Sequence, residues 1–145
     1  MTPLPCGTMS TELETSYGGV VVRGGELLVI TPAGKKVTGL PKGGMEAGET
    51  PAQVAAREVR EETGVVATVL EPLGDVRYTY RRGGRRVRKT VHFFLCEYVE
   101  GSTADHDHEV DDARWIALSS AGAQLSYPGE RALIERLLSK TAPGR

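Results

Sequence analysis

Cysteine, aromatic residues and long apolar runs are all scarce in this sequence, and each scarcity excludes a class of protein. The two cysteines, Cys6 and Cys96, are far apart and form neither a disulfide framework nor a metal-binding spacing. No apolar stretch approaches the ~20 residues of a membrane-spanning helix, and the N-terminus lacks the basic start and apolar run of a secretory signal. We therefore expect a protein of the reducing cytoplasm that has no membrane partner.

An excess of either charge is also absent, because 18 Lys and Arg residues stand against 19 Asp and Glu residues. A near-neutral chain of 145 residues fits one domain and implies no polyanionic partner for the surface as a whole. The charges are nevertheless segregated along the chain. Every charged residue from Arg77 to Lys89 is basic, and every charged residue from Glu97 to Asp112 other than histidine is acidic. This pattern leaves a nucleic-acid partner open without indicating one.

The chain divides into a short tail and one domain. Residues 1–15 are rich in Thr, Ser and Pro, which predicts a flexible N-terminal tail, and residues 16–145 are expected to form the domain. Strands are expected at residues 17–23 and 26–31 around Gly24-Gly25, and then at residues 65–70, 76–80, 87–99 and 112–118. A second amphipathic helix is expected at residues 128–140. One inserted and one terminal helix among these strands predict an α+β fold with a mixed sheet between helices.

A helix between these strands has clear boundary signals. Thr50 is a capping residue before a proline at the first helical position, and Gly64 fits the left-handed residue that ends a helix after Thr63. Its buried stripe is expected to consist of small and branched residues, namely Ala52, Ala55, Ala56 and Val59.

The segment from residue 43 to residue 65, GGMEAGETPAQVAAREVREETGV, carries the most specific pattern in the chain. Glu58 lies one helical turn from Glu61 and Glu62, so three carboxylates share one helix face. Like charges at this spacing destabilise a helix by about 0.2–0.5 kcal/mol per pair. A solvated helix with an Arg57–Glu61 ion pair is the structural explanation. A divalent cation is the functional one, because Mg²⁺ and Mn²⁺ prefer oxygen ligands.

This segment resembles the signature of the Nudix hydrolase family. In that signature, G is followed after five residues by E, and after seven more by R-E-U-x-E-E-x-G-U, with U aliphatic. Every fixed position is matched, by Gly43, Glu49, Arg57, Glu58, Val59, Glu61, Glu62, Gly64 and Val65. The resemblance implies an α/β/α sandwich over about residues 16–140. It also implies a hydrolase that cleaves a nucleoside diphosphate linked to another group.

Carried over by position, the resemblance implies roles for individual residues. Glu58, Glu61 and Glu62 resemble metal ligands for Mg²⁺ or Mn²⁺, helped by the Gly43 carbonyl, while Glu49 resembles the partner that holds Arg57 at the start of the helix. Glu109 is a candidate for the extra carboxylate that similar enzymes use for metal binding or as a base. The alternative is that Glu109 is one more acid in a solvated loop. The identity of the general base stays open.

The substrate is less well indicated. Leu40-Pro41-Lys42-Gly43 and the region from Arg77 to Phe94 resemble members that hydrolyse dinucleoside or diphosphoinositol polyphosphates. The expected substrate-binding residues are cations for phosphate and rings for a base: Lys42, Arg77, Arg88, Lys89, Tyr78, Tyr127 and His92. Ordinary surface or strand packing is the alternative for each. Diadenosine polyphosphates are the preferred substrate on this reading.

Other readings remain open. One is a hydrolase of oxidised nucleoside triphosphates, which would require an amide side chain at the base edge, and the sequence does not place one. RNA 5′-pyrophosphohydrolase, diphosphoinositol polyphosphate phosphohydrolase and ADP-ribose or sugar-nucleotide hydrolase are further enzyme classes. A nucleotide-sensing module without catalysis is the reading from a different class, although such members commonly lose the carboxylates that this chain keeps. A monomer and a homodimer are equally compatible with the sequence.

Overall fold

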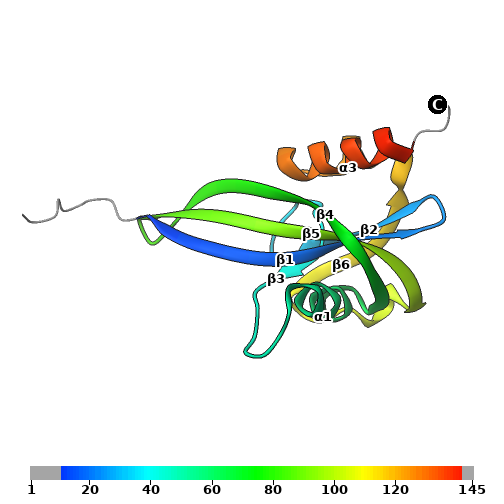
Figure 1. The fold of residues 1–145 in the computed structure, drawn as a ribbon, viewed down its shortest axis with the longest axis horizontal. Coiled ribbons are helices and arrows are strands. Elements are labelled where there is room, and N and C mark those ends of the chain that lie inside the picture. The colour runs from blue at the N-terminus through cyan, green and yellow to red at the C-terminus, as the bar shows by residue number, and fades with distance from the viewer. Residues whose placement is uncertain (1–10, 142–145) are drawn as a thin grey trace, which may run out of the picture.

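A mixed six-stranded sheet between helices forms the core of the computed structural model, which describes residues 11–141 (Figure 1). The strand order is β4-β5-β1-β2-β6, and β3 pairs with β1 outside this path. β1 and β5 run parallel, whereas the other pairs are antiparallel. The strands are β1 (Glu12–Arg23), β2 (Glu26–Pro32), β3 (Lys42–Gly43), β4 (Val65–Arg82), β5 (Arg85–Gly101) and β6 (Val110–Ala117). The predicted α+β fold is confirmed.

Helices cover both faces of the sheet (Figure 1). The helices are α1 (Pro51–Thr63), α2 (Ala121–Gln124) and α3 (Pro128–Thr141), with single 3₁₀ turns at Thr103–Asp105 and Leu118–Ser120. Under α3 the sheet buries a cluster that includes Val20, Phe93 and Leu133. Under α1 it buries a second cluster that includes Val21, Val59 and Cys96. Within a regular stretch of one strand, alternate residues supply the two clusters, so neighbouring side chains reach opposite faces of the sheet.

The predicted ends of α1 are confirmed. Thr50 accepts a hydrogen bond from the backbone of Gln53, whose side chain accepts one from the Thr50 backbone, and the two form a capping box. Gly64 has φ 81° and donates to the Arg60 carbonyl. The buried stripe differs from the expectation, because Ala52 and Ala56 are only partly buried, whereas Val54 is buried with Ala55 and Val59.

β1 begins at Glu12, so residues 12–15 belong to a strand and not to the predicted tail. They pair with β5 from Val87 to Thr90. The composition of this segment suggested a tail, but its backbone is ordered by hydrogen bonding to a strand that lies about 75 residues later in the sequence. Residues 1–10, which include Cys6, lie outside the described residues.

The strands predicted at residues 65–70 and 76–80 are one continuous strand, β4. The intervening EPLGD segment suggested a turn, but register shifts at Val69/Glu71 and Pro72/Gly74 absorb it as bulges. Pro72 is tolerated because β4 lies at the edge of the sheet, where a missing N–H leaves no partner unsatisfied. A Cβ at Gly74 would meet Leu133 at 2.8 Å, so the glycine lets α3 approach the strand closely.

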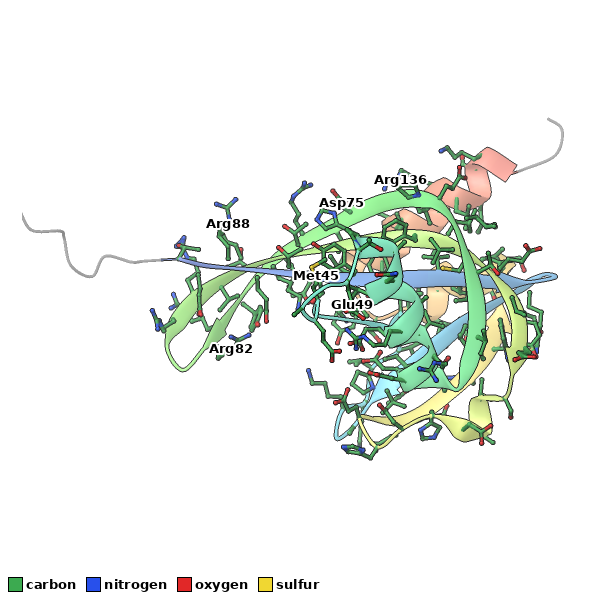
Figure 2. All side chains as sticks on the ribbon, turned by 60° about the horizontal axis from the view of Figure 1, so that its bottom comes forward. Met45, Glu49, Asp75, Arg82, Arg88 and Arg136 are labelled. Atoms are coloured by element: carbon green, nitrogen blue, oxygen red, sulfur yellow. The ribbon has the colours of Figure 1, made fainter. Side chains whose placement is uncertain are left out.

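Three strands extend past the helices as a projection that we call the arm (Figure 1). It comprises residues 12–15, 77–82 and 85–90, and the turn at Gly83-Gly84 closes its tip. One face of the arm continues the face of the sheet under α3, and we call it the inner face. The other is the outer face. Figure 2 shows Arg82 and Arg88 pointing to opposite sides of the arm.

Candidate active site

The loop before α1 is tied to the helix by Arg57. Its guanidinium donates to both carboxylate oxygens of Glu49, at 2.7 and 2.9 Å, and to the Gly44 carbonyl at 2.8 Å. It also reaches Glu58 at 2.9 Å and Glu61 at 3.2 Å. These partners raise the pKa of Arg57 above its ordinary value, Glu49 foremost, and keep the group charged. The expected contact between Glu49 and Arg57 is confirmed, and it fixes the loop against the first turns of the helix.

Two carboxylates of α1 are buried against β3. Glu58 lies so close to Gly43 that a Cβ at that position would overlap its carboxyl group, which gives the glycine a steric reason. Glu62 accepts a hydrogen bond of 3.1 Å from the backbone N–H of Lys42. Burial raises the pKa of Glu58, and it raises the pKa of Glu62 to about 8. A nearby positive charge would restore the ionised forms.

The acidic loop between β5 and β6 is fastened to the C-terminal part of α1. The backbone N–H of Asp107 donates to the Glu61 carbonyl at 3.0 Å, and the Asp107 carboxylate accepts from the Glu109 N–H at 3.0 Å. The Glu109 carbonyl in turn accepts from Ala33 at 3.0 Å. These contacts bring Glu109 near enough to Glu58 and Glu62 to raise the pKa of both.

The carboxylates do not converge on one point in this structure. Among residues 11–141, no group of three or more His, Cys, Asp or Glu side chains is arranged to hold a metal ion. The reason is visible in the contacts, since Arg57 holds Glu58 and Glu61 and the Lys42 backbone holds Glu62. Their chemistry suits a hard divalent cation, because all are oxygen donors and Glu62 is buried with a backbone N–H as its partner and no ion pair among the described residues.

A cavity of about 680 Å³ lies between β3, the arm and α3. Glu62 and Glu109 line one end of it, together with Gly43. The remaining lining residues are Ser16, Ile30, Pro32, Lys35, Lys42, Val76, Arg77, Tyr78, Tyr80, Lys89, Val91, Val110, Tyr127, Pro128, Gly129 and Glu130. The cavity therefore joins Glu62, the one carboxylate of the signature that lines it, to basic and aromatic side chains from other elements.

The end of the cavity next to α3 contains a second buried carboxyl group. Glu130 is 3% exposed and accepts a hydrogen bond of 3.1 Å from the Leu40 N–H through one oxygen. Its other oxygen has no hydrogen-bond partner among the described residues. Burial raises the pKa of Glu130 to about 7 although Lys42 opposes the shift. Burial and the Glu130 carboxyl together raise the pKa of Tyr78 to about 12 and also raise that of Tyr127. Two phenol rings thus lie near an acid group that is partly neutral at physiological pH.

Lys89 enters the cavity from the arm, but a carboxylate compensates its charge. Glu14 lies 3.4 Å from the Lys89 ammonium and also pairs with Arg82 at 3.0 Å. Tyr80 donates a hydrogen bond to the same carboxylate, and this contact is the main reason that the pKa of Glu14 is lowered. A phosphate group that bound Lys89 would therefore compete with Glu14.

The structure brings most of the predicted substrate residues to the cavity, but not all. Lys42, Tyr78, Lys89 and Tyr127 line it, and the Lys42 ammonium lies 5.8 Å from the centre of the Tyr127 ring. Arg77 lies at its rim, with its guanidinium 3.4 Å from Asp75 and its side chain 69% exposed.

Arg88 and His92 are not among the residues that line this cavity, and their predicted contact with a substrate stays a prediction. Both have even numbers on β5, whereas Lys89 and Val91 have odd numbers and face the cavity. His92 is instead bonded to Asp75 at 2.7 Å and stacked on Tyr17 with ring centres 5.3 Å apart.

Reading the sequence missed three residues of this site: Glu14, Asp107 and Glu130. Glu14 fell within the predicted tail. Asp107 was one of several acids in a loop. Glu130 had a usable signal, because it shares a helical face with Leu133, Ile134 and Leu137, all of which are buried. An acid on the apolar face of a helix is a candidate for a buried functional group.

Comparison with known proteins agrees with the geometry. The model of the NUDIX domain matches residues 14–137. The chain is 39% identical over 137 residues to a Mycobacterium tuberculosis protein that carries the name mutator protein MutT4, with 88% of this chain and 55% of that protein covered. It is 36% identical over 101 residues to the 8-oxo-(d)GTP phosphatase of Mycolicibacterium smegmatis, with 70% and 30% covered. The chain thus spans about half or less of these relatives.

Solved structures share the fold at lower identity. A NUDIX hydrolase from Nitrosomonas europaea superposes with a TM-score of 0.72 at 20% identity, covering 89% of this chain and 90% of that one. An Ap4A hydrolase from C. elegans superposes with a TM-score of 0.68 at 21% identity, covering 90% and 99%. Among the described residues, no helix has the length and apolar content to cross a membrane. The complete signature, the match over residues 14–137 and the shared fold identify this chain as a Nudix hydrolase.

Proposed function

We propose that this pyrophosphohydrolase acts on nucleoside triphosphates, including those with an oxidised base, and that it uses Mg²⁺ or Mn²⁺. The observation that carries the proposal is the cavity itself. It has acidic groups that suit a cation at one end, lysines along its wall, and two phenol rings with a buried carboxyl group at the other end. A nucleotide has the same order of parts: a metal-bound phosphate chain, a sugar and a flat base with polar edges.

The acidic end suits the phosphate chain with its cation. Glu58, Glu61, Glu62 and Glu109 would hold the cation with the Gly43 carbonyl, once Arg57 releases Glu58 and Glu61 to it. When bound, the cation would neutralise phosphate charge and make a water molecule more acidic. The chain's own contribution is to fix these groups, since Arg57 and Glu49 hold the loop before α1 and Asp107 holds the loop that carries Glu109.

Lys42 and Lys89 line the same wall and would bind phosphate oxygens between the two ends. Lys42 carries the larger share in this proposal, because Glu14 compensates the charge of Lys89. Lys35 also lines the cavity and adds positive charge at its opening. Phosphoryl transfer depends chiefly on positioning and charge stabilisation, and these side chains supply both.

The Glu130 end suits a nucleobase. A neutral carboxyl group offers one donor and one acceptor side by side, as an amide does, and this arrangement can pair with a base edge. Glu130 therefore fills the place of the amide side chain that a hydrolase of oxidised nucleotides was expected to require. Tyr78 and Tyr127 are positioned to pack against the faces of the base. The names of the two mycobacterial relatives support this choice among Nudix substrates.

Diadenosine polyphosphates are the second candidate, and one observation favours them. Lys89 and Tyr80 line the cavity toward the arm, beyond Tyr78, where a longer phosphate chain and a second nucleoside would extend. Binding there would require Lys89 to give up its ion pair with Glu14 and form one with a phosphate group. The LPKG entry at Lys42 gives the same indication from the sequence.

A panel of substrates with Mg²⁺ tests the proposal by phosphate and pyrophosphate release. It should contain dGTP, 8-oxo-dGTP, diadenosine tetraphosphate, ADP-ribose, a diphosphoinositol phosphate and triphosphorylated RNA. We expect the highest kcat/KM for a nucleoside triphosphate. Higher kcat/KM for diadenosine tetraphosphate would select the second candidate. Tight nucleotide binding without turnover of any compound would indicate a sensing module and reject both.

A further inference from the structure

The tip of the arm concentrates positive charge that the rest of the described chain does not compensate. Arg81, Arg85 and Arg86 are exposed and form no ion pair with a carboxylate among residues 11–141. The Arg81 guanidinium donates only to the carbonyl of Gly84, at 3.1 Å. Arg82 is the exception, since it pairs with Glu14 at 3.0 Å. The tip is therefore a cationic surface separate from the network that holds Lys89.

Strand register makes this charge costly for the isolated protein. Arg81 lies directly opposite Arg86 and Arg82 directly opposite Arg85 in the antiparallel ladder. Like charges at directly opposed positions destabilise a sheet, whereas a bound anion between them offsets the repulsion. Glu14 compensates Arg82 in the second pair, but Arg81, Arg85 and Arg86 have no such carboxylate among residues 11–141, and their exposed charge points to an anionic partner.

The residue types indicate phosphate and argue against base recognition. The five basic residues from Arg81 to Arg88 are all arginine, whose planar guanidinium binds phosphate oxygens through two hydrogen bonds. The outer face of the arm carries no aromatic side chain between Arg77 and Thr90, because only arginine and threonine occupy those positions. Single strands are usually held by stacking bases on aromatic rings. A duplex, whose bases are already stacked, needs only contacts to its backbone.

The shape of the tip selects among duplexes. Of the described residues, only those of β4 and β5 extend beyond Glu12, where β1 begins, and they form a two-stranded ribbon closed by Gly83 and Gly84 at φ 59° and 81°. No described atom lies within 4 Å of a Cβ built on either glycine, so neither glycine packs against another described element. The major groove of B-DNA admits a two-stranded ribbon, whereas the deep, narrow major groove of A-form RNA does not.

We propose that the ribbon tip docks in the major groove of duplex DNA through phosphate contacts from both of its faces. Arg81 and Arg86 on the outer face would contact one wall of the groove, and Arg85 on the inner face the other. The contacts carry no base specificity. The interaction is independent of the proposed nucleotide substrate, because the tip arginines do not line the cavity and DNA would leave it open.

The test is the affinity of the full chain for a fluorescein-labelled 20-base-pair DNA duplex, measured by anisotropy in EDTA at 50 to 200 mM KCl. The main variant is R81Q/R85Q/R86Q, which removes charge from exposed side chains. The matched control is R60Q/R136Q/K140Q, which removes the same charge from exposed positions on α1 and α3 (Figure 2 labels Arg136). Single-stranded DNA, duplex RNA and anionic lipid vesicles are parallel probes.

We expect the tip variant to bind the DNA duplex at least ten-fold more weakly than the unchanged protein, and the control to bind within two-fold of it. The slope of log K against log salt should fall in magnitude by about 3, since each phosphate contact contributes ~0.9. Nucleotide hydrolysis should be unaffected. Equal weakening in both variants, tighter binding to any parallel probe, or no binding by the unchanged protein at 50 mM KCl would each overturn the proposal. Failure of the nucleotide panel would leave this result intact.

Discussion

The two ends of the cavity use the same chemical group, a buried carboxyl, in opposite surroundings. Glu62 is one of several acids at its end, and Glu58 and Glu109 add their charge to the cost of its burial. Among residues 11–141, no second carboxylate raises the pKa of Glu130, whereas the Leu40 N–H and the charge of Lys42 lower it. Several acids together need a cation, whereas one isolated acid is satisfied by a proton. The same side chain can therefore serve phosphate chemistry at one end and hydrogen-bond recognition at the other.

Replacing Glu62 by Gln removes a negative charge from the acidic end of the cavity, and we expect the largest loss of activity from this change. Gln keeps the size of the side chain and an oxygen that can accept from the Lys42 N–H, but it removes the charge that a cation needs. We expect kcat for nucleoside triphosphate hydrolysis to fall by roughly 10³-fold, a size typical for loss of a charge-stabilising group. Phosphate or pyrophosphate release in Mg²⁺ measures the effect.

The control for Glu62→Gln is Glu71→Gln, which neutralises an exposed acid on β4. A melting temperature for Glu62→Gln that is no lower than that of Glu71→Gln would show that the loss is chemical and not structural. An unimpaired Glu62→Gln enzyme would remove this carboxylate from the metal site.

The pH dependence of stability tests the protonation of Glu130, at the other end of the cavity. Glu130 has a folded-state pKa of about 7, raised by burial from an ordinary value of 4.5. As pH rises from about 4.5 to about 7, the unfolded chain releases this proton before the folded chain does, so stability falls across that window. The full shift corresponds to roughly 3 kcal/mol. Glu130→Gln should remove this loss and melt higher than the unchanged protein at pH 8, while the two differ little at pH 4.5.

Thermal melts of both proteins from pH 4.5 to pH 8 measure this difference, with Glu135→Gln on the exposed side of α3 as control. A parallel pH dependence for the unchanged and Glu130→Gln proteins would mean that Glu130 is ionised in the folded state. The donor role proposed for a neutral carboxyl would then be wrong.

The two ends also differ in how far the sequence alone could predict them. The signature between Gly43 and Val65 predicted the helix, its caps and the contact of Arg57 with Glu49, because all of these depend on residues within about two helical turns or one loop of each other. Local spacing is sufficient for local geometry. The sequence could not decide whether Glu109 joins this end or lies in a solvated loop. The answer depends on how a loop some 45 residues later attaches to α1.

The end of the cavity at Glu130 depends on contacts between distant segments, so the sequence predicted only some of its residues. Glu130 meets Leu40 across 90 positions in the sequence. The alternation along β5 placed His92 opposite Val91 correctly, but it could not decide which of the two faces borders the cavity. Arg88 and His92 were expected beside the substrate and lie on the face that does not line this cavity. Pro72 and Gly74 suggested a turn. They are instead tolerated within β4 by its edge position and its bulges, which are properties of the whole sheet and cannot be read from a local segment.

Substrate preference provides a second test of the end of the cavity at Glu130. Removing the carboxyl with Glu130→Ala should lower kcat/KM for the preferred nucleotide by about 10- to 30-fold, since a buried hydrogen bond to a base edge contributes about 1–3 kcal/mol. Glu130→Gln should retain most of the activity, because an amide reproduces one donor and one acceptor. Hydrolysis of diadenosine tetraphosphate, dGTP and 8-oxo-dGTP should be compared for each variant. Loss of activity in the Gln variant equal to that in the Ala variant would contradict recognition by a neutral acid.

We expect the smallest effect from Asp107, a residue of the acidic end that acts on the site through Glu109. Asp107 accepts from the Glu109 N–H and donates its own N–H to the Glu61 carbonyl, so it is a positioning residue. Asp107→Ala should lower kcat about five-fold and raise the Mg²⁺ concentration needed for half-maximal activity, because Glu109 loses its fixed position. Asp107→Asn keeps an accepting oxygen and should restore both values. Asp105→Ala, at an exposed neighbour in the same loop, provides the matched control. If Asp107→Ala and Asp105→Ala require the same Mg²⁺ concentration as the unchanged enzyme, Glu109 does not depend on this loop and its part in metal binding loses support.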